Sequence, residues 1–309
     1  MDTISKIRQK SKSNPKNIIL PEYEDKRVRE AARIIEKEGI AKIALLSRDM
    51  LNPDDKARYA RQYYELRKYK GVTEEAAAKL FEDPLYYSAM MVREGKADGV
   101  VAGASHTTPD VARSTIHCLG VEKRLGIACS CFIMAVPDCS YGENGTFVFA
   151  DCGIVPEPNP RQLAAISVAA SELARKVLDI TPRVAMLSYS TKGSAQGERI
   201  DKVRQAIAIV KEMSPELMVD GELQVDAAIV PEISRIKYPD SVLGGEANVL
   251  IFPNLEAGNI AYKLVERLAK ARALGPLILG LNRPCSDLSR GCSAEDIVDC
   301  VAVTSIRAQ

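Results

Sequence analysis

Short apolar segments alternate with amphipathic segments along most of the chain, and this alternation constrains the fold more than any other feature. The first three segments predict a strand over residues 17–20, a helix over residues 25–38 that Gly39 ends, and a strand over residues 41–46. Strands that alternate with helices are typical of α/β proteins, in which helices cover both faces of a mainly parallel sheet.

The same alternation continues to the C-terminal end. Further strands are expected over residues 97–103, 127–136, 183–188, 227–230, 249–251 and 277–279. Further helices are expected over residues 74–81 (capped by Thr73), 109–119 (opened by Pro109), 160–178, 200–213 and 257–274. Residues 137–160 are rich in Pro, Gly, Asn and Asp and are expected to form a loop.

Length and charge limit the classes of function. A chain of 309 residues corresponds to about two domains of ~150 residues each. With 42 basic and 41 acidic residues the net charge is +1, so bulk electrostatics point to neither nucleic acid nor a membrane surface. No apolar stretch reaches the ~18 residues of a membrane span, and the N-terminal segment does not resemble a signal peptide. We therefore expect a cytoplasmic protein.

Cysteine and histidine usage limits the possible chemistry. The eight cysteines show neither Cys-x-x-Cys nor zinc-finger spacing, which predicts reduced thiols and no metal site. Cys129 and Cys131 alternate along a predicted strand, so both are expected to pack in the core. Only His106 and His117 are available as imidazole bases, which favours carboxylates as general bases.

Polar residues follow several predicted strands, and ligands of parallel α/β sheets bind beyond the carboxyl ends of the strands. Ser190-Thr191-Lys192-Gly193 offers hydroxyl groups, an ammonium and a glycine, as a phosphate cradle requires, although it lacks P-loop spacing. Lys263 and Arg267 lie four residues apart, on one face of a predicted helix, and are candidates to hold phosphate. The other candidate ligand-binding residues are Ser105, His106, Thr107, Asn254, Asn259 and Asn282.

The densest group of chemically active side chains lies near the C-terminal end, around Ser289-Arg290-Gly291-Cys292. Ser293 followed by Asp296, just before an apolar run, predicts a capping box at the start of a helix. The N-terminal end of a helix carries unpaired N–H groups and partial positive charge. With Arg290 beside it, this loop is a candidate anion receptor.

This segment resembles the C-terminal signature of the phosphate acetyltransferases, also called phosphotransacetylases. Other blocks that resemble the same family extend the likeness to nearly the whole chain. In order, they are residues 65–71, residues 103–108 leading to Arg113, residues 187–195, residues 221–228 and residues 247–263.

The resemblance implies two three-layer α/β/α domains with mainly parallel sheets, of the isopropylmalate-dehydrogenase-like type, with the active-site cleft between them. Residues 1–126 together with 277–309 would form the first domain and residues 127–276 the second. It also implies a homodimer and no tightly bound cofactor or metal.

The family catalyses reversible acetyl transfer between coenzyme A and inorganic phosphate, without a covalent acyl-enzyme. By position in the matched motif, Asp296 is expected to take the proton of the coenzyme A thiol, Arg290 to stabilise the transition state, and Ser289 to orient the thiol. The same resemblance assigns Arg67, Arg113, Ser289 and Cys292 to coenzyme A binding.

The expected proton transfer is uphill in water, because a free thiol has a pKa near ~8.5 and a free Asp near ~3.9, a gap of roughly 6 kcal/mol. Burial of Asp296 and a positive field at the thiol would narrow this gap. A direct ion pair to Arg290 would instead make Asp296 a weaker base. Arg290 is therefore expected to face the acetyl carbonyl and phosphate rather than Asp296.

Four alternatives remain open at the level of sequence. The first is a reaction through an acyl-Cys292 intermediate, and the second is a preference for butyryl or propionyl groups. The third is a non-catalytic acetyl-coenzyme A sensor, like the related domains of large malic enzymes; the presence of Ser289, Arg290 and Asp296, and the absence of an upstream catalytic domain, argue against it. A dehydrogenase is disfavoured because no Gly-x-Gly-x-x-Gly fingerprint follows a strand.

Overall fold

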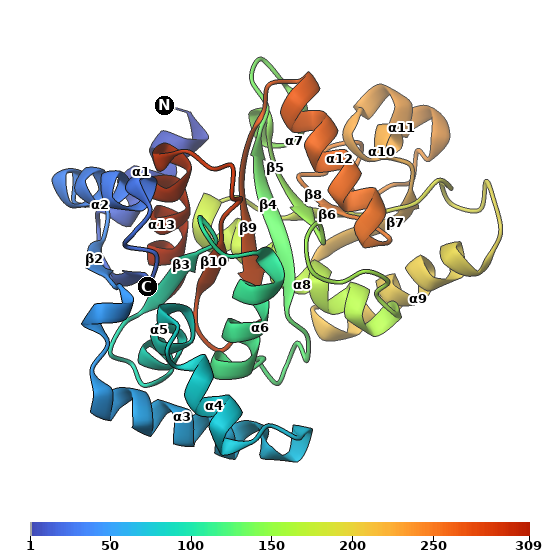
Figure 1. The fold of residues 1–309 in the computed structure, drawn as a ribbon. Coiled ribbons are helices and arrows are strands. Elements are labelled where there is room, and N and C mark those ends of the chain that lie inside the picture. The colour runs from blue at the N-terminus through green and yellow to red at the C-terminus, as the bar shows by residue number, and fades with distance from the viewer. Residues whose placement is uncertain (1) are drawn as a thin grey trace. The chain divides into compact units, whose positions relative to one another are not determined.

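The computed structural model describes residues 2–309, which form two compact units (Figure 1). Unit 1 comprises the described chain up to Glu122 together with Leu281–Gln309, and unit 2 comprises Lys123–Gly280. The sequence prediction placed the two crossings near residues 126 and 277. Both units have the mixed α/β architecture that the alternating pattern predicts, with mostly parallel strands.

Unit 1 contains four parallel strands in the order β2-β1-β3-β10. They are β1 (Asn17–Leu20), β2 (Lys42–Leu45), β3 (Gly99–Ala102) and β10 (Cys285–Asp287). Ile18, Ile19 and Leu20 are buried, as are all residues of β3 and β10. Because the strands are parallel, the loops after β1, β3 and β10 leave the same edge of the sheet.

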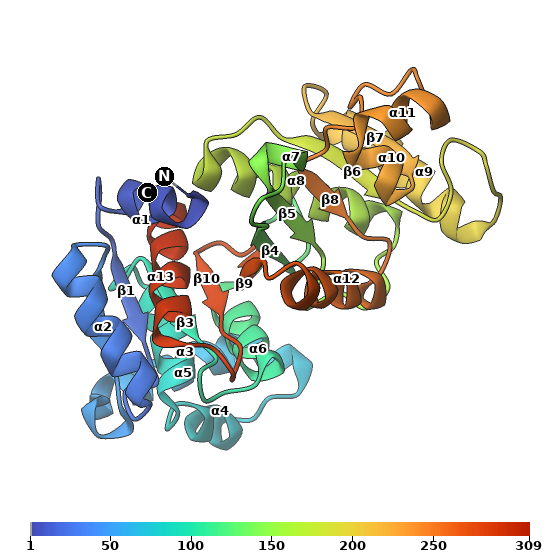
Figure 2. The ribbon, with the colours of Figure 1, turned by 90° about the horizontal axis from the view of Figure 1, so that it is seen from above.

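Seven helices and two short 3₁₀ segments complete unit 1. They are α1 (Thr3–Ser11), α2 (Lys26–Glu38), α3 (Pro53–Arg67), α4 (Glu74–Leu80), α5 (Pro84–Arg93), α6 (Thr108–Leu119), α13 (Ala294–Ala308), η1 (Arg48–Met50) and η2 (Lys68–Lys70). Helix α13 packs against α1, α2, β1 and β3 (Figures 1 and 2). Helices α3, α5 and α6 form a second packed group, with α4 against α3.

The helix ends follow the chemistry that the sequence predicts. Asp25 caps α2, and Gly39 ends it in the left-handed conformation with φ of 70°. Thr73 caps α4 by accepting from the Ala76 N–H. Ser293 and Asp296 form the predicted capping box of α13.

Unit 2 contains six strands in the order β9-β4-β5-β8-β6-β7. They are β4 (Cys129–Ala135), β5 (Thr146–Ala150), β6 (Arg183–Leu187), β7 (Met218–Leu223), β8 (Val249–Ile251) and β9 (Arg272–Leu279). Strand β4 is antiparallel to both β5 and β9, and the other pairs are parallel. Cys129 and Cys131 are fully buried in β4, as expected.

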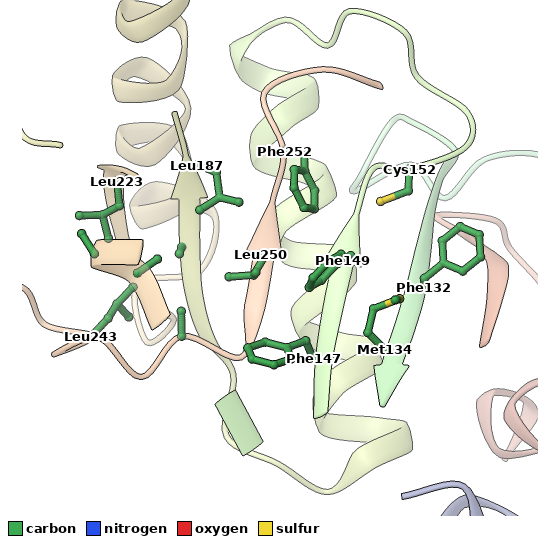
Figure 3. Close-up of a cluster of buried hydrophobic side chains, with 14 of the residues drawn as sticks. Phe132, Met134, Phe147, Phe149, Cys152, Leu187, Leu223, Leu243, Leu250 and Phe252 are labelled. Atoms are coloured by element: carbon green, nitrogen blue, oxygen red, sulfur yellow. The ribbon is translucent and has the colours of Figure 1, made fainter. Parts of the chain in front are cut away.

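Six helices belong to unit 2: α7 (Tyr141–Asn144), α8 (Pro160–Leu178), α9 (Glu198–Met213), α10 (Val225–Ile229), α11 (Pro231–Lys237) and α12 (Leu255–Leu268). Helices α8 and α9 pack together against the sheet. The residues in Figure 3 form an apolar cluster that includes Phe132, Phe149 and Phe252, and α10 and α12 pack against it. The Phe132 and Tyr262 rings are stacked with centroids 4.1 Å apart.

Three sequence predictions in unit 2 are wrong. Residues 137–160 contain α7 and the buried strand β5 rather than a loop, because the turn residues on either side obscured the four-residue apolar run 147–150. Residues 227–230 lie largely in α10 rather than in a strand, since a short apolar run fits either structure. The helix expected to reach residue 274 ends at Leu268, and β9 begins at Arg272.

None of the helices formed by residues 2–309 is both long enough and apolar enough to span a membrane.

Candidate active site

Three loops meet at the carboxyl edge of the unit 1 sheet, after β1, β3 and β10. Gly103 begins the second loop with φ of 119°, and a Cβ on it would lie 2.4 Å from Asp287 Oδ1 and 2.6 Å from the Leu288 N. Only glycine allows the β3 loop to approach the β10 loop this closely. The polar residues of these loops can therefore contact one another.

The buried carboxylate of Glu22, in the β1 loop, organises the β3 loop. Its Oε2 accepts from the N–H groups of Gly103 (3.0 Å) and Ala104 (2.9 Å), and its Oε1 from those of Ser105 (2.8 Å) and His106 (3.0 Å). The His106 Nδ1 lies 2.7 Å from the same Oε1. Burial alone would raise the pKa of Glu22, but these hydrogen bonds outweigh it and lower the pKa.

His106 lies between two carboxylates. Its Nε2 is 3.4 Å from Asp83 Oδ2, and its Nδ1 faces Glu22. Hydrogen bonds to Asp83 and Glu22 outweigh burial and raise the pKa of His106 to about 10. At neutral pH the ring is therefore an imidazolium engaged on both nitrogens, which makes it a structural cation rather than a general base.

Arg27, in the first turn of α2, joins the β3 loop to the β10 loop. Its Nη2 donates to the Ala104 carbonyl (2.8 Å), and its Nη1 donates to the carbonyls of Arg290 and Cys292 (2.8 Å each). Asp25 accepts from Nε (3.0 Å) and Nη2 (2.6 Å) and so fixes the guanidinium. The backbone of the loop before α13 is thus held by a residue far away in the sequence.

The side chains expected to carry the chemistry lie on that loop. Ser289 and Arg290 are exposed, and Ser289 Oγ accepts from the Gly291 N–H at 3.2 Å. Asp296 Oδ2 accepts from the Ser293 N–H (2.9 Å) and hydroxyl (2.8 Å).

The Cys292 thiol does not have the character of an activated nucleophile. Burial raises the pKa of Cys292 to about 11, and the nearby positive charge of Arg27 offsets this only in part. The thiol is therefore protonated near neutral pH. This observation weighs against the acyl-cysteine alternative.

Asp287, at the end of β10, is a third buried carboxyl group in this region. Thr108 Oγ1 donates to its Oδ2, while Oδ1 has no hydrogen-bond partner within the described chain. Burial raises the pKa of Asp287 to about 7. Unlike Glu22, this carboxyl group has no cation beside it.

Arg67, at the end of α3, and Arg113, on α6, lie near one histidine. Arg67 Nη2 is 3.2 Å from His117 Nε2. The positive charges of both arginines act on His117, after burial itself, to lower the pKa of its ring. Arg113 also lies 3.4 Å from the exposed Asp110 carboxylate. The structure thus brings together the two arginines that the resemblance assigns to coenzyme A.

The predicted phosphate cradle in unit 2 is organised around the carboxylate of Glu222. Glu222 Oε1 accepts from the Ser190 hydroxyl (2.9 Å) and the Gly193 N–H (2.8 Å). Arg204 donates to both oxygens of the same carboxylate, at 2.9 and 3.0 Å. Lys192 Nζ lies 2.7 Å from Asp220. Several donors expected to face phosphate are therefore engaged within the unit.

Thr191 and Thr107 bond locally: Thr191 Oγ1 accepts from the Gln224 N–H, and Thr107 caps α6. Ser105 Oγ lies 3.5 Å from Asp25 Oδ2. The three predicted asparagines also have structural partners. Asn254 caps α12, Asn259 donates to the Cys152 carbonyl at 3.0 Å, and Asn282 donates to the Leu119 carbonyl at 3.1 Å.

Lys263 and Arg267 are both exposed on α12, one turn apart. Lys263 Nζ lies 5.6 Å from the centroid of the Tyr262 ring, and Arg267 Nε lies 3.7 Å from Glu266. The predicted site residues thus fall into two groups: those on the loops and helices of unit 1, and those of unit 2.

Sequence reasoning missed Glu22, Arg27 and Asp83. Asp25 and Asp83 resemble ordinary helix caps, and they do cap α2 and α5. Glu22 stands in a short charged run that is typical of a solvated turn. One available signal was its position directly after a buried strand, where parallel α/β proteins collect functional groups.

No group of three or more His, Cys, Asp or Glu side chains arranged to hold a metal ion is found within residues 2–309.

Comparison with known proteins identifies relatives along the whole length. A family model described as phosphate acetyl/butaryl transferase matches residues 2–305. A phosphate acetyltransferase from Thermoanaerobacterium thermosaccharolyticum is 48% identical, with 100% of each chain covered. The structure of a phosphotransacetylase from Streptococcus pyogenes aligns with a TM-score of 0.91 at 38% identity, covering 99% of this chain and 98% of the other. The structure of a phosphotransacetylase from Staphylococcus aureus aligns with a TM-score of 0.85 at 36% identity, covering 99% of this chain and 98% of the other. The chain belongs to the phosphate acetyl/butaryl transferase family.

Proposed function

We propose that this protein transfers an acetyl group reversibly between coenzyme A and inorganic phosphate, at the loops of unit 1. The observation that carries the proposal is the loop before α13. Its backbone is fastened by Arg27, while the Ser289 and Arg290 side chains remain exposed. A fixed backbone that presents a guanidinium to solvent suits the binding of an anionic substrate.

In the proposed reaction the Asp296 carboxylate takes the proton of the coenzyme A thiol. The thiolate sulfur attacks the carbonyl carbon of acetyl phosphate, so that a C–S bond forms as the C–O bond to phosphate breaks and phosphate leaves. Arg290 stabilises the negative charge that develops on the carbonyl oxygen and phosphate, and Ser289 orients the thiol. The reverse reaction uses the same groups in the opposite order.

The test is phosphate- or arsenate-dependent release of free thiol from acetyl-coenzyme A. Arg290→Gln and Asp296→Asn are each expected to lower turnover by about 100-fold or more, because each removes a group that acts on the barrier. Ser289→Ala is expected to have a smaller effect. Arg235→Gln is a matched control, because Arg235 lies in unit 2 on α11 and is 70% exposed. Near-normal turnover in both Arg290→Gln and Asp296→Asn would contradict the proposal.

Cys292→Ala separates direct attack from an acyl-cysteine route. The protonated, buried thiol supports the direct route, so turnover is expected to stay within about threefold of wild type. A loss comparable to that of Arg290→Gln, together with acetyl label retained on the denatured protein, would establish the covalent route instead.

Acetyl is proposed as the preferred group over propionyl or butyryl. Comparing the rates for the three acyl-coenzyme A substrates tests this choice, since each methylene changes transition-state binding by about 1 to 3 kcal/mol. Acetyl-coenzyme A binding with no thiol release would point to a sensing module. We further propose that the protein is a homodimer without a tightly bound cofactor or metal, as the family resemblance implies. We also propose that it is cytoplasmic, which the N-terminal sequence and the lack of a long apolar stretch support.

A further inference from the structure

His117, which the proposed reaction does not use, contacts the side chain of Arg67. Besides the 3.2 Å contact of its Nε2 with Arg67 Nη2, its Nδ1 lies 3.0 Å from the hydroxyl of Tyr63. Tyr63 is buried and Arg67 half-buried, both on α3, whereas His117 lies on α6. The imidazole therefore ties the end of α3 to α6.

The chemistry of the partners fixes the tautomer of this ring. A guanidinium carries only N–H donors, so His117 Nε2 must be the acceptor of the bond to Arg67. The proton of the neutral ring then lies on Nδ1, which donates to the Tyr63 oxygen. Only the neutral form makes both bonds, because an imidazolium has no acceptor to offer Arg67.

The charges around the ring favour that neutral form. Burial, followed by the positive charges of Arg67 and Arg113, lowers the pKa of His117. The groups that face the ring from α3 are Tyr63 and Arg67, and Arg113 lies on the same helix as His117. None of these side chains is a carboxylate.

Arg67 itself lacks an internal counter-ion. Its Nε is buried without a hydrogen-bond partner, and no ion pair to a carboxylate is found for it within the part of the chain that the structure describes. A half-buried guanidinium with an unsatisfied N–H is costly unless an anion completes its environment. The Arg67 guanidinium is thus held in place by His117 and still has hydrogen-bond donors that no group of the protein satisfies within the described residues.

We propose that His117 is a positioning residue that fixes the guanidinium of Arg67 to receive a phosphate group of coenzyme A. This inference rests on the proposed function and adds to it a residue that the matched motifs do not include. The imidazole does not touch the phosphate. It accepts one N–H of Arg67, and the other N–H groups of that guanidinium, with the positive charge of Arg113 nearby, are left to attract the anion.

Two substitutions at His117 separate the two bonds of the ring. A glutamine amide reaches the place of Nε2 and can still accept from Arg67, whereas an asparagine amide reaches the place of Nδ1 and retains only the Tyr63 contact. His117→Asn is expected to raise the KM for coenzyme A about fivefold with kcat changed less than about twofold. His117→Gln is expected to stay near wild type in both constants.

A second experiment repeats the comparison of the two variants with different thiol substrates. With pantetheine, which has no phosphate group, the two variants are expected to perform alike, because Arg67 then has no anion to receive. Dephospho-coenzyme A, which lacks only the 3′-phosphate, identifies the phosphate group that Arg67 binds. If His117→Asn no longer raises the KM with this substrate, Arg67 binds the 3′-phosphate. If the raised KM persists, Arg67 binds the pyrophosphate. Either result supports the role of His117.

Calorimetric titration with coenzyme A gives a readout independent of turnover. It is expected to show the same fivefold loss in His117→Asn, with a melting temperature close to that of His117→Gln. Equal affinities in the two variants, or an equal defect with pantetheine, would overturn the inference. Absence of acetyl transfer in the wild type with every thiol would instead contradict the proposed function, while the binding comparison would still decide the role of His117.

Discussion

Glu22 in unit 1 and Glu222 in unit 2 have the same task but different partners. Each is a buried glutamate whose carboxylate gathers the backbone of a polar loop that follows a strand. Glu22 accepts from four successive backbone N–H groups and His106. Glu222 accepts from one backbone N–H, the Ser190 hydroxyl and two nitrogens of Arg204.

The difference lies in where the balancing cation sits. His106 is mostly buried and is flanked by Glu22 and Asp83, so its charge depends on them. Arg204 is 40% exposed and its charge is permanent. A loop can therefore be held by a buried carboxylate either through a half-buried imidazolium shared between two carboxylates or through a more exposed cation of permanent charge.

Truncating the two glutamates is expected to give the largest contrast. Glu22→Ala removes the acceptor of four N–H groups and leaves the half-buried His106 imidazolium with Asp83 alone, and is expected to lower the free energy of unfolding by about 3 to 5 kcal/mol. Glu222→Ala is expected to cost about 1 to 3 kcal/mol, because water can solvate Arg204. Urea unfolding measures both. Equal losses would show that exposure of the cation does not matter.

The two networks are expected to fail at opposite ends of the pH scale. Because the pKa of His106 is raised from 6.5 to about 10, its contribution is complete below pH 6.5 and is lost as pH rises through about 10. Because the pKa of Glu222 is lowered from 4.5 to about 2, its contribution is complete above pH 4.5 and is lost as pH falls through about 2.

Urea unfolding of wild type from about pH 3 to about pH 10 measures these two limbs. The alkaline limb is expected to span about 4 kcal/mol and the acid limb about 2 kcal/mol. His106→Gln is expected to flatten the alkaline limb only, and Glu222→Gln to flatten part of the acid limb only. An alkaline limb unchanged in His106→Gln would mean that the imidazole is not protonated in the folded protein.

Asp287 sharpens the comparison, since it is buried without a cation bonded to it among residues 2–309. An acid whose pKa is raised by folding, here from 3.8 to about 7, costs stability as pH rises above its unfolded pKa. Relative to wild type, Asp287→Asn is therefore expected to gain about 2 to 3 kcal/mol between about pH 5 and about pH 8. A constant difference across this range would show that Asp287 titrates normally.

Features governed by local rules could be predicted from the sequence. The apolar runs of β1 and β8 and the whole of α8 have the bounds that periodicity predicts. The capping box of α13 follows from Ser293 and Asp296 alone, because it depends on contacts three residues apart. The loop carrying Ser289 and Arg290 was placed before α13 for the same reason.

Features that depend on distant partners could not be predicted. The role of Arg27 rests on carbonyl groups at positions 104, 290 and 292, and nothing near Arg27 in the sequence indicates them. The cradle at Ser190 offered the residue types that phosphate needs, but Glu222, more than thirty positions away, accepts from several of its donors. Whether a hydroxyl or N–H remains open to a ligand is set by tertiary contacts.

The bonds of Arg27 have a consequence for how substrate is recognised. A guanidinium has five N–H hydrogens, and here Asp25 takes two while three carbonyl oxygens take the others. This arginine is saturated, so an incoming anion would have to break an existing bond to engage it. Of Arg27 and Arg290, the two arginines described at this edge of the sheet, Arg27 holds the architecture, whereas the exposed guanidinium of Arg290 can receive a guest.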